Sequence, residues 1–253
     1  MTSFVSSPDQ ASTVSPRGAE PAHLMFLRWL FAASSVLTPV VLALYGILNP
    51  TPLHVTKGVV AIAVNASASP LANQVHLVCG VALSFLLPVW YLGMAWLALR
   101  KAPWLAIFAG LLALVGWIPW SALIGQEALT YSMAQMGSSA QLAAIWEHYN
   151  GSGVLTAYLL IYIVGHLLSA VLLGIALGRA HVVPAWAAWA LALTSPLQIM
   201  AFIVHQLGVI LVAVLFWFVS SLPIAQAFLR GNADRDPRPL DARLERKASR
   251  SDS

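Results

Sequence analysis

Three sets of residues, all polar except for one glycine, interrupt apolar stretches of the sequence, and each set is spaced to share one face of a helix. Steps of about three, four or seven residues return a side chain to nearly the same side of a helix. The sets are His76, Gly80 and Ser84; Tyr158, Tyr162, His166 and Ser169; and Thr194, Gln198 and His205. Polar groups are costly in lipid, so we expect the three faces to turn toward one another and to line a shared polar interior.

The chemistry open to these residues is hydrogen bonding, proton exchange and, at the histidines, ligation of a metal ion or a haem. From the rise of a helix, His166 is expected near the middle of the membrane, and His76 and His205 near its outer boundary, close to Glu127. A haem held by two histidines needs both at similar depth, a condition that His76 and His205 meet and His166 does not. The same histidines could equally be structural hydrogen-bonding residues between helices.

The overall composition is that of a membrane protein. The chain has 253 residues, of which 59% are hydrophobic and 9% are charged, and its mean hydropathy is +0.79. Soluble domains carry about 25% charged residues, so a water-soluble globular fold is excluded. The single cysteine, Cys79, excludes an internal disulfide and any zinc or iron–sulfur site built from cysteines.

Six apolar stretches are long enough to cross a bilayer, which predicts an all-α polytopic membrane helix bundle. Within a domain of residues 23–229, we place the spans at residues 25–48, 74–99, 103–123, 154–178, 183–204 and 207–229. The polar tails at residues 1–22 and 230–253 are expected to be disordered. The apolar piece at residues 58–64 is too short to cross, so we expect a folded loop there rather than a re-entrant segment. Glu147, in the second outer loop, is expected to be solvated.

The basic residues predict the orientation. With both termini in the cytoplasm, Lys57 is the one outer residue among the thirteen lysines and arginines. The alanine-rich composition suggests a bacterial source, so we expect a multi-pass protein of the plasma membrane. Its expected partners are the lipid bilayer, a hydrophobic small molecule or lipid, and another membrane protein. The basic C-terminal tail is explained by topology and by attraction to anionic lipid, so no nucleic-acid partner is expected.

A set of residues in the hinges and spans, mostly in the second half of the chain, resembles a pattern found in other proteins. It comprises His166, Leu173, Gly174, Leu177, Arg179, Val183, Pro184, Trp186, Trp189, Pro196, Leu197 and His205, together with Arg100, Pro103, Gly110 and Gly116 at an earlier hinge. With these residues, the chain from about residue 75 to about residue 229 resembles a group of uncharacterised actinobacterial multi-pass membrane proteins. The resemblance implies a bundle of about six transmembrane helices and no particular activity.

Missing signatures narrow the function. The spans contain no lysine for a retinal Schiff base, and no paired carboxylates for a proton-coupled transporter of the usual kind or a Mg²⁺-dependent diphosphate enzyme. We therefore predict a non-enzymatic carrier, sensor or accessory subunit. Its polar pocket would lie between the second, fourth and fifth spans, open to the outside and narrowing toward His166. Two alternatives are a haem- or metal-binding protein that uses His76 and His205, and an intramembrane enzyme acting on a lipid-like substrate.

Overall fold

Every apolar span of the sequence is helical in the computed structural model, which describes residues 21–51, 55–137 and 139–230. These residues contain no β-strand, which confirms the all-α fold. The helices are α1 (Ala22–Leu48), α2 (Gly58–Ser67), α3 (Pro70–Ala98), α4 (Pro103–Trp117), α5 (Trp120–Gln135), α6 (Ala140–Asn150), α7 (Gly153–Ala180), α8 (Ala185–Val204) and α9 (Leu207–Leu229). The tails expected to be disordered lie outside the described residues, apart from Pro21, Ala22 and Arg230.

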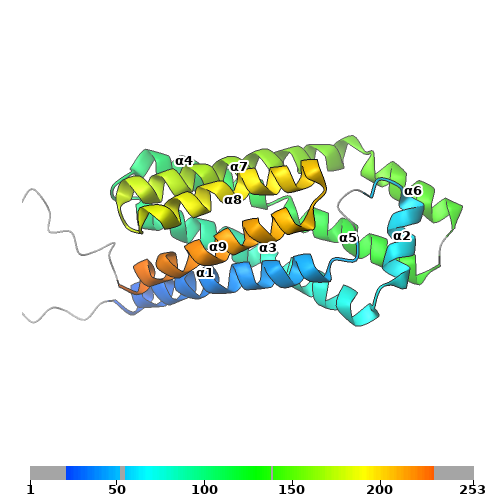
Figure 1. Cartoon of the computed structure of the whole chain (residues 1–253), viewed down its shortest axis with the longest axis horizontal. Helices are drawn as coiled ribbons and strands as arrows, with labels where there is room; N and C mark the ends of the chain where they lie inside the picture. Colours follow the sequence, from blue (N-terminus) through cyan, green and yellow to red (C-terminus); the bar gives the residue numbers. More distant parts are fainter. Residues whose placement is uncertain (1–20, 52–54, 138, 231–253) are drawn as a thin grey trace, which may run out of the picture.

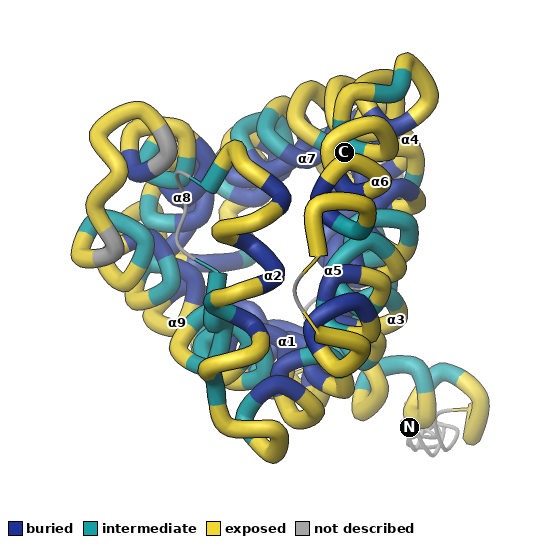
Figure 2. The backbone as a smooth tube through the Cα atoms, turned by 90° about the vertical axis from the view of Figure 1, so that its right-hand side faces the viewer, coloured by how far each residue is buried: buried dark blue, intermediate teal, exposed yellow. Residues whose placement is uncertain are grey.

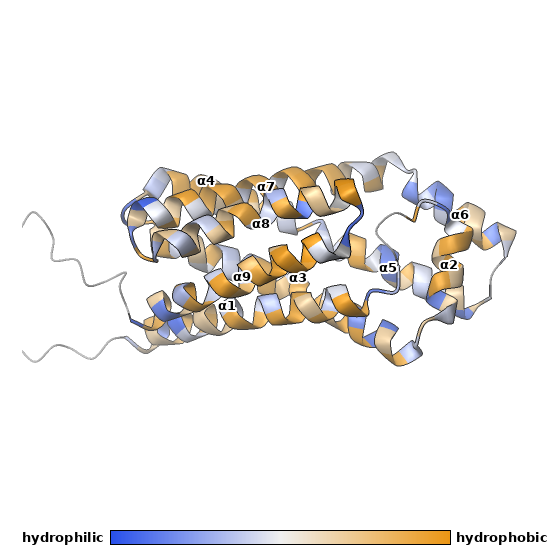
Figure 3. Cartoon of the chain, in the orientation of Figure 1, coloured by the Kyte–Doolittle hydropathy of each residue, from blue (hydrophilic) through white to orange (hydrophobic). Residues whose placement is uncertain are grey.

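Within the described residues, five helical segments are long and apolar enough to cross a membrane. They are α1, α3, the combined run Pro103–Gln135, α7 and the segment Gly208–Leu229 of α9. The remaining expected span, at residues 183–204, corresponds to α8, which is 20 residues long and packs against both α7 and α9 (Figure 1). Figure 3 shows that hydrophobic residues dominate these long helices. The chain is a polytopic membrane helix bundle.

The long helices form a closed ring. α1 packs against α3 and α9, α8 against α9 and α7, and α4 against α7 and α3, while α3 also contacts α7 across the ring. Both ends of the described chain lie at one end of this ring, together with the α3–α4 and α7–α8 connections (Figure 1). We call it the basic end, because every lysine and arginine of the described residues except Lys57 lies there.

A cap covers the opposite end of the ring and consists of α2, the second half of α5, and α6 (Figures 1 and 2). The cap has a small core of its own, formed by Ala61, Ile62, Met133, Ala134 and Trp146. The backbone N–H of Gly58 donates to Oε1 of Glu147 at 3.1 Å, which places a carboxylate at the positive N-terminal end of α2. Glu147 is exposed, as expected, yet it also fastens α6 to α2.

Three segments expected to be loops are helical instead, among them the part of the second outer loop that carries Glu147, which forms α6. The apolar piece at residues 58–64 lies within α2. The third span does not end near residue 123: the helix breaks at Pro119, which has no N–H to continue the ladder, and α5 then runs to Gln135. α2 and α5 pack on each other in the cap, and this tertiary contact stabilises helices whose own sequence pattern is weak.

Gly116 of α4 and Gly165 of α7 bring two helices of the ring into backbone contact. A Cβ atom on Gly116 would lie 2.5 Å from the carbonyl carbon of Gly165, and a Cβ on Gly165 would lie 2.4 Å from the Cα of Gly116. Small residues allow this kind of close approach between membrane helices. The next residue of α7, His166, is 4% exposed and thus lies inside the ring.

Large aromatic side chains fill the ring between the basic end and the cap. Trp90 and Trp217 are fully buried and meet edge to face, with ring centroids 5.6 Å apart. Trp117 lies 6.4 Å from Trp217 and 5.5 Å from Tyr91, again between centroids. The interior of the ring is therefore solid at this depth, and the aromatic layer forms a floor below the cap.

Candidate functional site

A cavity of about 690 Å³ lies between the aromatic floor and the cap, and we call it the chamber. All the described helices contribute to its wall. Its polar lining residues are Tyr45, Asn49, Thr51, Asn65, Asn73, His76, Gln126, Glu127, Thr130, Tyr131, Asn150, Tyr162, Gln198 and His205. Its tryptophans are Trp117, Trp120, Trp146 and Trp217. The chamber thus joins an apolar, aromatic wall to a limited set of polar groups.

Glu127 of α5 is held in the chamber wall by side chains from two other helices. Tyr45 of α1 donates its hydroxyl to Oε1 of Glu127 at 2.7 Å, and Nε2 of His76 in α3 lies 3.1 Å from Oε2. The other ring nitrogen of His76, Nδ1, lies 2.8 Å from the backbone carbonyl oxygen of Tyr45. The side chain of His76 is 3% exposed and that of Glu127 is 31% exposed. The histidine is therefore buried behind the carboxylate, and the carboxylate is open to the chamber.

These contacts determine where the protons of the cluster lie. A carbonyl oxygen can only accept, so Nδ1 of His76 carries a hydrogen and donates it to Tyr45. Nε2 and the carboxylate of Glu127 can approach each other only with a proton between them. That proton belongs either to an imidazolium beside a carboxylate or to a carboxylic acid beside a neutral imidazole. In both cases His76 and Glu127 share one bridging proton, and the pair carries no net charge.

A second histidine–tyrosine pair lies behind the chamber wall. Nδ1 of His166 donates to the carbonyl oxygen of Tyr162 at 2.7 Å, and the two rings stack with centroids 4.3 Å apart. Nε2 of His166 lies 3.2 Å from Oε1 of Gln198. Turning the amide of Gln198 round presents its NH₂ to Nε2, so a neutral His166 satisfies both contacts. Tyr162 and Gln198 line the chamber, which therefore ends against these two residues, with His166 behind them.

Five of the residues expected in the pocket do not line the chamber: His166, which lies behind its wall, and Ser84, Tyr158, Ser169 and Thr194. Ser84, Ser169 and Thr194 donate their hydroxyls to carbonyl oxygens three or four residues earlier in their own helices. Such bonds satisfy a hydroxyl without any neighbouring helix. Tyr158 is 40% exposed and lies in a stretch of α7, residues 156–161, that is exposed throughout. At this depth α7 presents Leu159 and Tyr162, not Tyr158, to the chamber.

His205 lines the chamber from the turn between α8 and α9. It is exposed, and it ends α8 in the left-handed conformation, with φ 53°. His76 and His205 thus border one chamber, as the haem or metal hypothesis requires. Both ring nitrogens of His76 already have partners. Within the described part of the chain, no three histidine, cysteine, aspartate or glutamate side chains are placed to hold a metal ion together.

Sequence spacing missed the amides that join the walls of the chamber. Asn65 of α2 donates to the hydroxyl of Thr51 at 3.0 Å, and Asn73 of α3 donates to the carbonyl oxygen of Asn65 at 3.2 Å. On another wall, Gln126 of α5 donates to the side-chain oxygen of Asn150. In the sequence, a single asparagine or glutamine beside an apolar span is indistinguishable from a loop residue. The one feature that could have indicated their role is that such amides occur near the outer ends of several spans.

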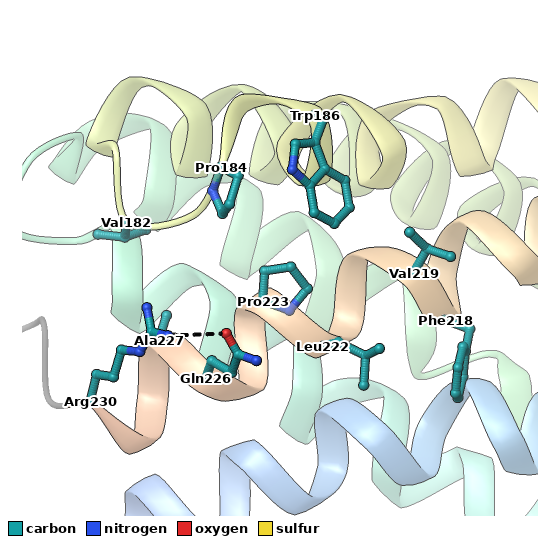
Figure 4. A pocket seen from close by; sticks show the side chains of 10 residues that line it. All are labelled: Val182, Pro184, Trp186, Phe218, Val219, Leu222, Pro223, Gln226, Ala227 and Arg230. Carbon is teal, nitrogen blue, oxygen red and sulfur yellow. Dashed lines mark hydrogen bonds between the residues drawn. The ribbon is translucent and has the colours of Figure 1, made fainter.

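A smaller hollow of about 400 Å³ lies at the basic end, between the start of α8 and the last turns of α9. Figure 4 shows Pro184 and Trp186 on one side of it and Pro223 and Gln226 on the other, with Arg230 donating to Oε1 of Gln226 at 3.4 Å. Its described lining residues include no histidine and no acid. Of these two hollows, the chamber alone has histidines and an acid among its described lining residues.

Comparison of the chain with protein-family models, with curated proteins and with solved structures finds no match. The resemblance to actinobacterial multi-pass proteins therefore stays a prediction. The function is inferred from the residues and geometry of the chamber.

Proposed function

We propose that this protein binds a small organic molecule in the chamber, as a membrane carrier, a sensor or an accessory subunit of a membrane complex. The observation that carries the proposal is the chamber of about 690 Å³. Sites for small molecules measure about 300–1,000 Å³ and combine a mostly apolar wall with a few convergent polar groups. Four tryptophans line this chamber, and flat aromatic surfaces of this kind favour an aromatic or amphipathic ligand.

The direction of entry in this proposal follows from the distribution of charge. Cytoplasmic loops of membrane proteins carry an excess of lysine and arginine. The basic end therefore faces the cytoplasm, and the cap faces the outside. In a bacterial plasma membrane, the ligand would enter the chamber beneath the cap, either from the outer solution or from the outer leaflet.

A haem or metal ion is the second candidate, and one observation favours it: His76 and His205 line the same chamber. Ligation through Nε2 of His76 would require that nitrogen to leave Glu127, since Nδ1 is held by Tyr45. The visible absorption spectrum of the purified, untagged protein tests this alternative. A Soret band that disappears in His205→Ala would support haem, and a spectrum without one would exclude it.

The intramembrane-enzyme alternative gains no support from the chamber. The aliphatic hydroxyls among its described lining residues are Thr51 and Thr130. Each already accepts a hydrogen bond, Thr51 from Asn65 and Thr130 from Trp146. Neither is paired with a histidine that could activate it as a nucleophile, as an acyl-transfer enzyme acting through a hydroxyl requires.

Cysteine labelling tests whether the chamber is open to the outside. In a Cys79→Ala background, a membrane-impermeant methanethiosulfonate reagent is added to intact cells that carry Ile210→Cys or Val212→Cys. Ile210 lines the chamber, whereas Val212, two residues later on α9, is 43% exposed and is not a chamber residue. We expect labelling at Ile210→Cys and much less at Val212→Cys, because the reagent reacts with thiols that water reaches.

A pair of glycines supplies the matched control for this experiment. A Cβ on Gly46 or on Gly125 would meet nothing within 4 Å, but only Gly46 is a chamber residue. Gly46→Phe should fill the chamber and strongly slow labelling of Ile210→Cys, whereas Gly125→Phe should leave the rate unchanged. Equal labelling at positions 210 and 212, or no effect of Gly46→Phe, would contradict the proposal.

A further inference from the structure

Glu127 gives the chamber a single acidic side chain in an aromatic setting. Among the described lining residues it is the one carboxylate, and none of them is a lysine or an arginine. The titratable side chains that share the chamber with it are Tyr45 from α1, His76 from α3, Tyr131 from α5, Tyr162 from α7 and His205 from the α8–α9 turn. A ligand that enters the chamber therefore meets one fixed acid, with no permanently charged base beside it.

A series of packed aromatic rings begins at the tyrosine that binds this carboxylate. The ring of Tyr45, whose hydroxyl binds Glu127, lies 5.2 Å from Trp120, and Trp120 lies 5.7 Å from Tyr162, measured between centroids. The indole of Trp120 is held in place by donation to the carbonyl oxygen of Gly80 at 3.0 Å. Aromatic faces attract a cation within about 6 Å of the ring centre, and the attraction grows when the site is shielded from water.

Building on the function proposed above, we propose that the ligand is a small organic cation, a substituted amine or quaternary ammonium with an apolar or aromatic body. Its positive charge lies against the carboxylate of Glu127 and the rings of Tyr45 and Tyr162, on the faces opposite the histidines that stack on them. The hydroxyl of Tyr45 and the ring of His76 hold the carboxylate in place from behind. A neutral ligand would use the same rings but could not replace the proton shared with His76 as the positive partner of the carboxylate, and among the described lining residues no lysine or arginine would bind an anion.

Two probes of nearly the same shape separate charge from size: benzyltrimethylammonium and its uncharged carbon analogue neopentylbenzene. Their binding to the full-length protein in detergent is measured by isothermal titration calorimetry, with protein-free micelles as the blank. We expect the cation to bind at least about tenfold more tightly than the neutral analogue, the ratio that corresponds to about 1.4 kcal/mol. Glu127→Gln keeps the shape of the side chain and an oxygen acceptor for Tyr45. This variant should abolish the preference for the cation. Its affinity for benzyltrimethylammonium should fall about tenfold, while its affinity for neopentylbenzene should change less than about twofold.

A second variant keeps the test valid if Glu127→Gln does not fold. Tyr162→Leu removes an aromatic ring but leaves Glu127 and the residues that hydrogen-bond to it unchanged. It should therefore lower the affinity for the cation more than the affinity for the neutral analogue. Equal affinities in the wild type, an unchanged preference in both variants, or no binding of the cation at its solubility limit would overturn the assignment. Each of these results leaves the labelling of Ile210→Cys as it was, and so leaves the proposed function standing. Loss of that labelling would instead refute the proposed function.

Discussion

Replacing Gly116 by alanine tests how far the chamber depends on the contact between α4 and α7. The new Cβ would lie 2.5 Å from the backbone of Gly165 and of His166, whereas ordinary contact begins at 3.4 Å. The helices would therefore have to separate by roughly 0.9 Å, and the atoms on the other side of the contact belong to backbone, which no rotamer change can move. Overpacking of this kind costs about 1–3 kcal/mol. We expect the upper part of that range, because a backbone yields less readily than a side chain.

For a chain of this size, about 2–3 kcal/mol corresponds to a fall in Tm of roughly 4–12 °C. The assay is thermal unfolding of purified variants in one detergent. Gly125→Ala is the control, because a Cβ there meets nothing within 4 Å and alanine favours a helix over glycine by about 1 kcal/mol. Its Tm should therefore stay the same or rise.

The partner variant Gly165→Ala strains the same contact from the other side, with its Cβ 2.4 Å from the Cα of Gly116. We expect a similar fall in Tm. The double variant should lose less than the two single variants added together, because the first separation of the helices already makes room for the second methyl group. If Gly116→Ala and Gly125→Ala unfold at the same temperature, the backbones of α4 and α7 are not in contact and the reasoning fails.

Other contacts lead to simpler expectations. His181 ends α7 at φ 52°, a conformation that favours glycine. His181→Gly should therefore raise the free energy of unfolding by about 0.5–1 kcal/mol and the Tm by roughly 1–4 °C. An unchanged Tm would show that the position carries no strain. Glu147→Ala removes the acceptor of the Gly58 N–H, so the backbone amides of α2 should exchange hydrogen about two- to fivefold faster than in the wild type. Equal exchange rates in the variant and the wild type would show that the cap does not need this contact. Binding of benzyltrimethylammonium at Glu127 should displace the proton shared with His76. Calorimetry in two buffers of different ionisation enthalpy should therefore detect the release of one proton on binding. The same binding heat in both buffers would show that the proton stays.

The residues that sequence spacing could identify are those on long helices that must avoid lipid. His76, Tyr162 and Gln198 interrupt apolar spans, and the cost of placing them in lipid predicts that they face inward. All three line the chamber. Ser169 and Thr194 have the same spacing but bind their own backbone. Spacing therefore overestimates the role of serine and threonine, whose hydroxyls need no partner outside the helix.

The rest of the site depends on contacts between distant parts of the chain. Tyr45 follows Ser34 and Thr38 at helical spacing, but its partner is Glu127, 82 positions further along the chain, which no spacing within α1 could reveal. α2 is helical in the cap because it packs on α5 and α6, not because of a strong pattern of its own. The order of helices around the ring was also beyond prediction, since each span has enough apolar surface to pack against several others or against lipid.

α5 runs from the floor of the chamber to the cap as one continuous helix. It begins at Trp120, which packs beside Tyr45, carries Glu127 midway, and buries Met133 in the core of the cap. Packed, rigid elements of this kind transmit displacement from one end to the other. A ligand that pulls on Glu127 should therefore also shift α2 and α6, so the surface of the cap should report whether the chamber is occupied. By reciprocity, an antibody fragment bound to α2 or α6 would change the affinity of a chamber that it never touches.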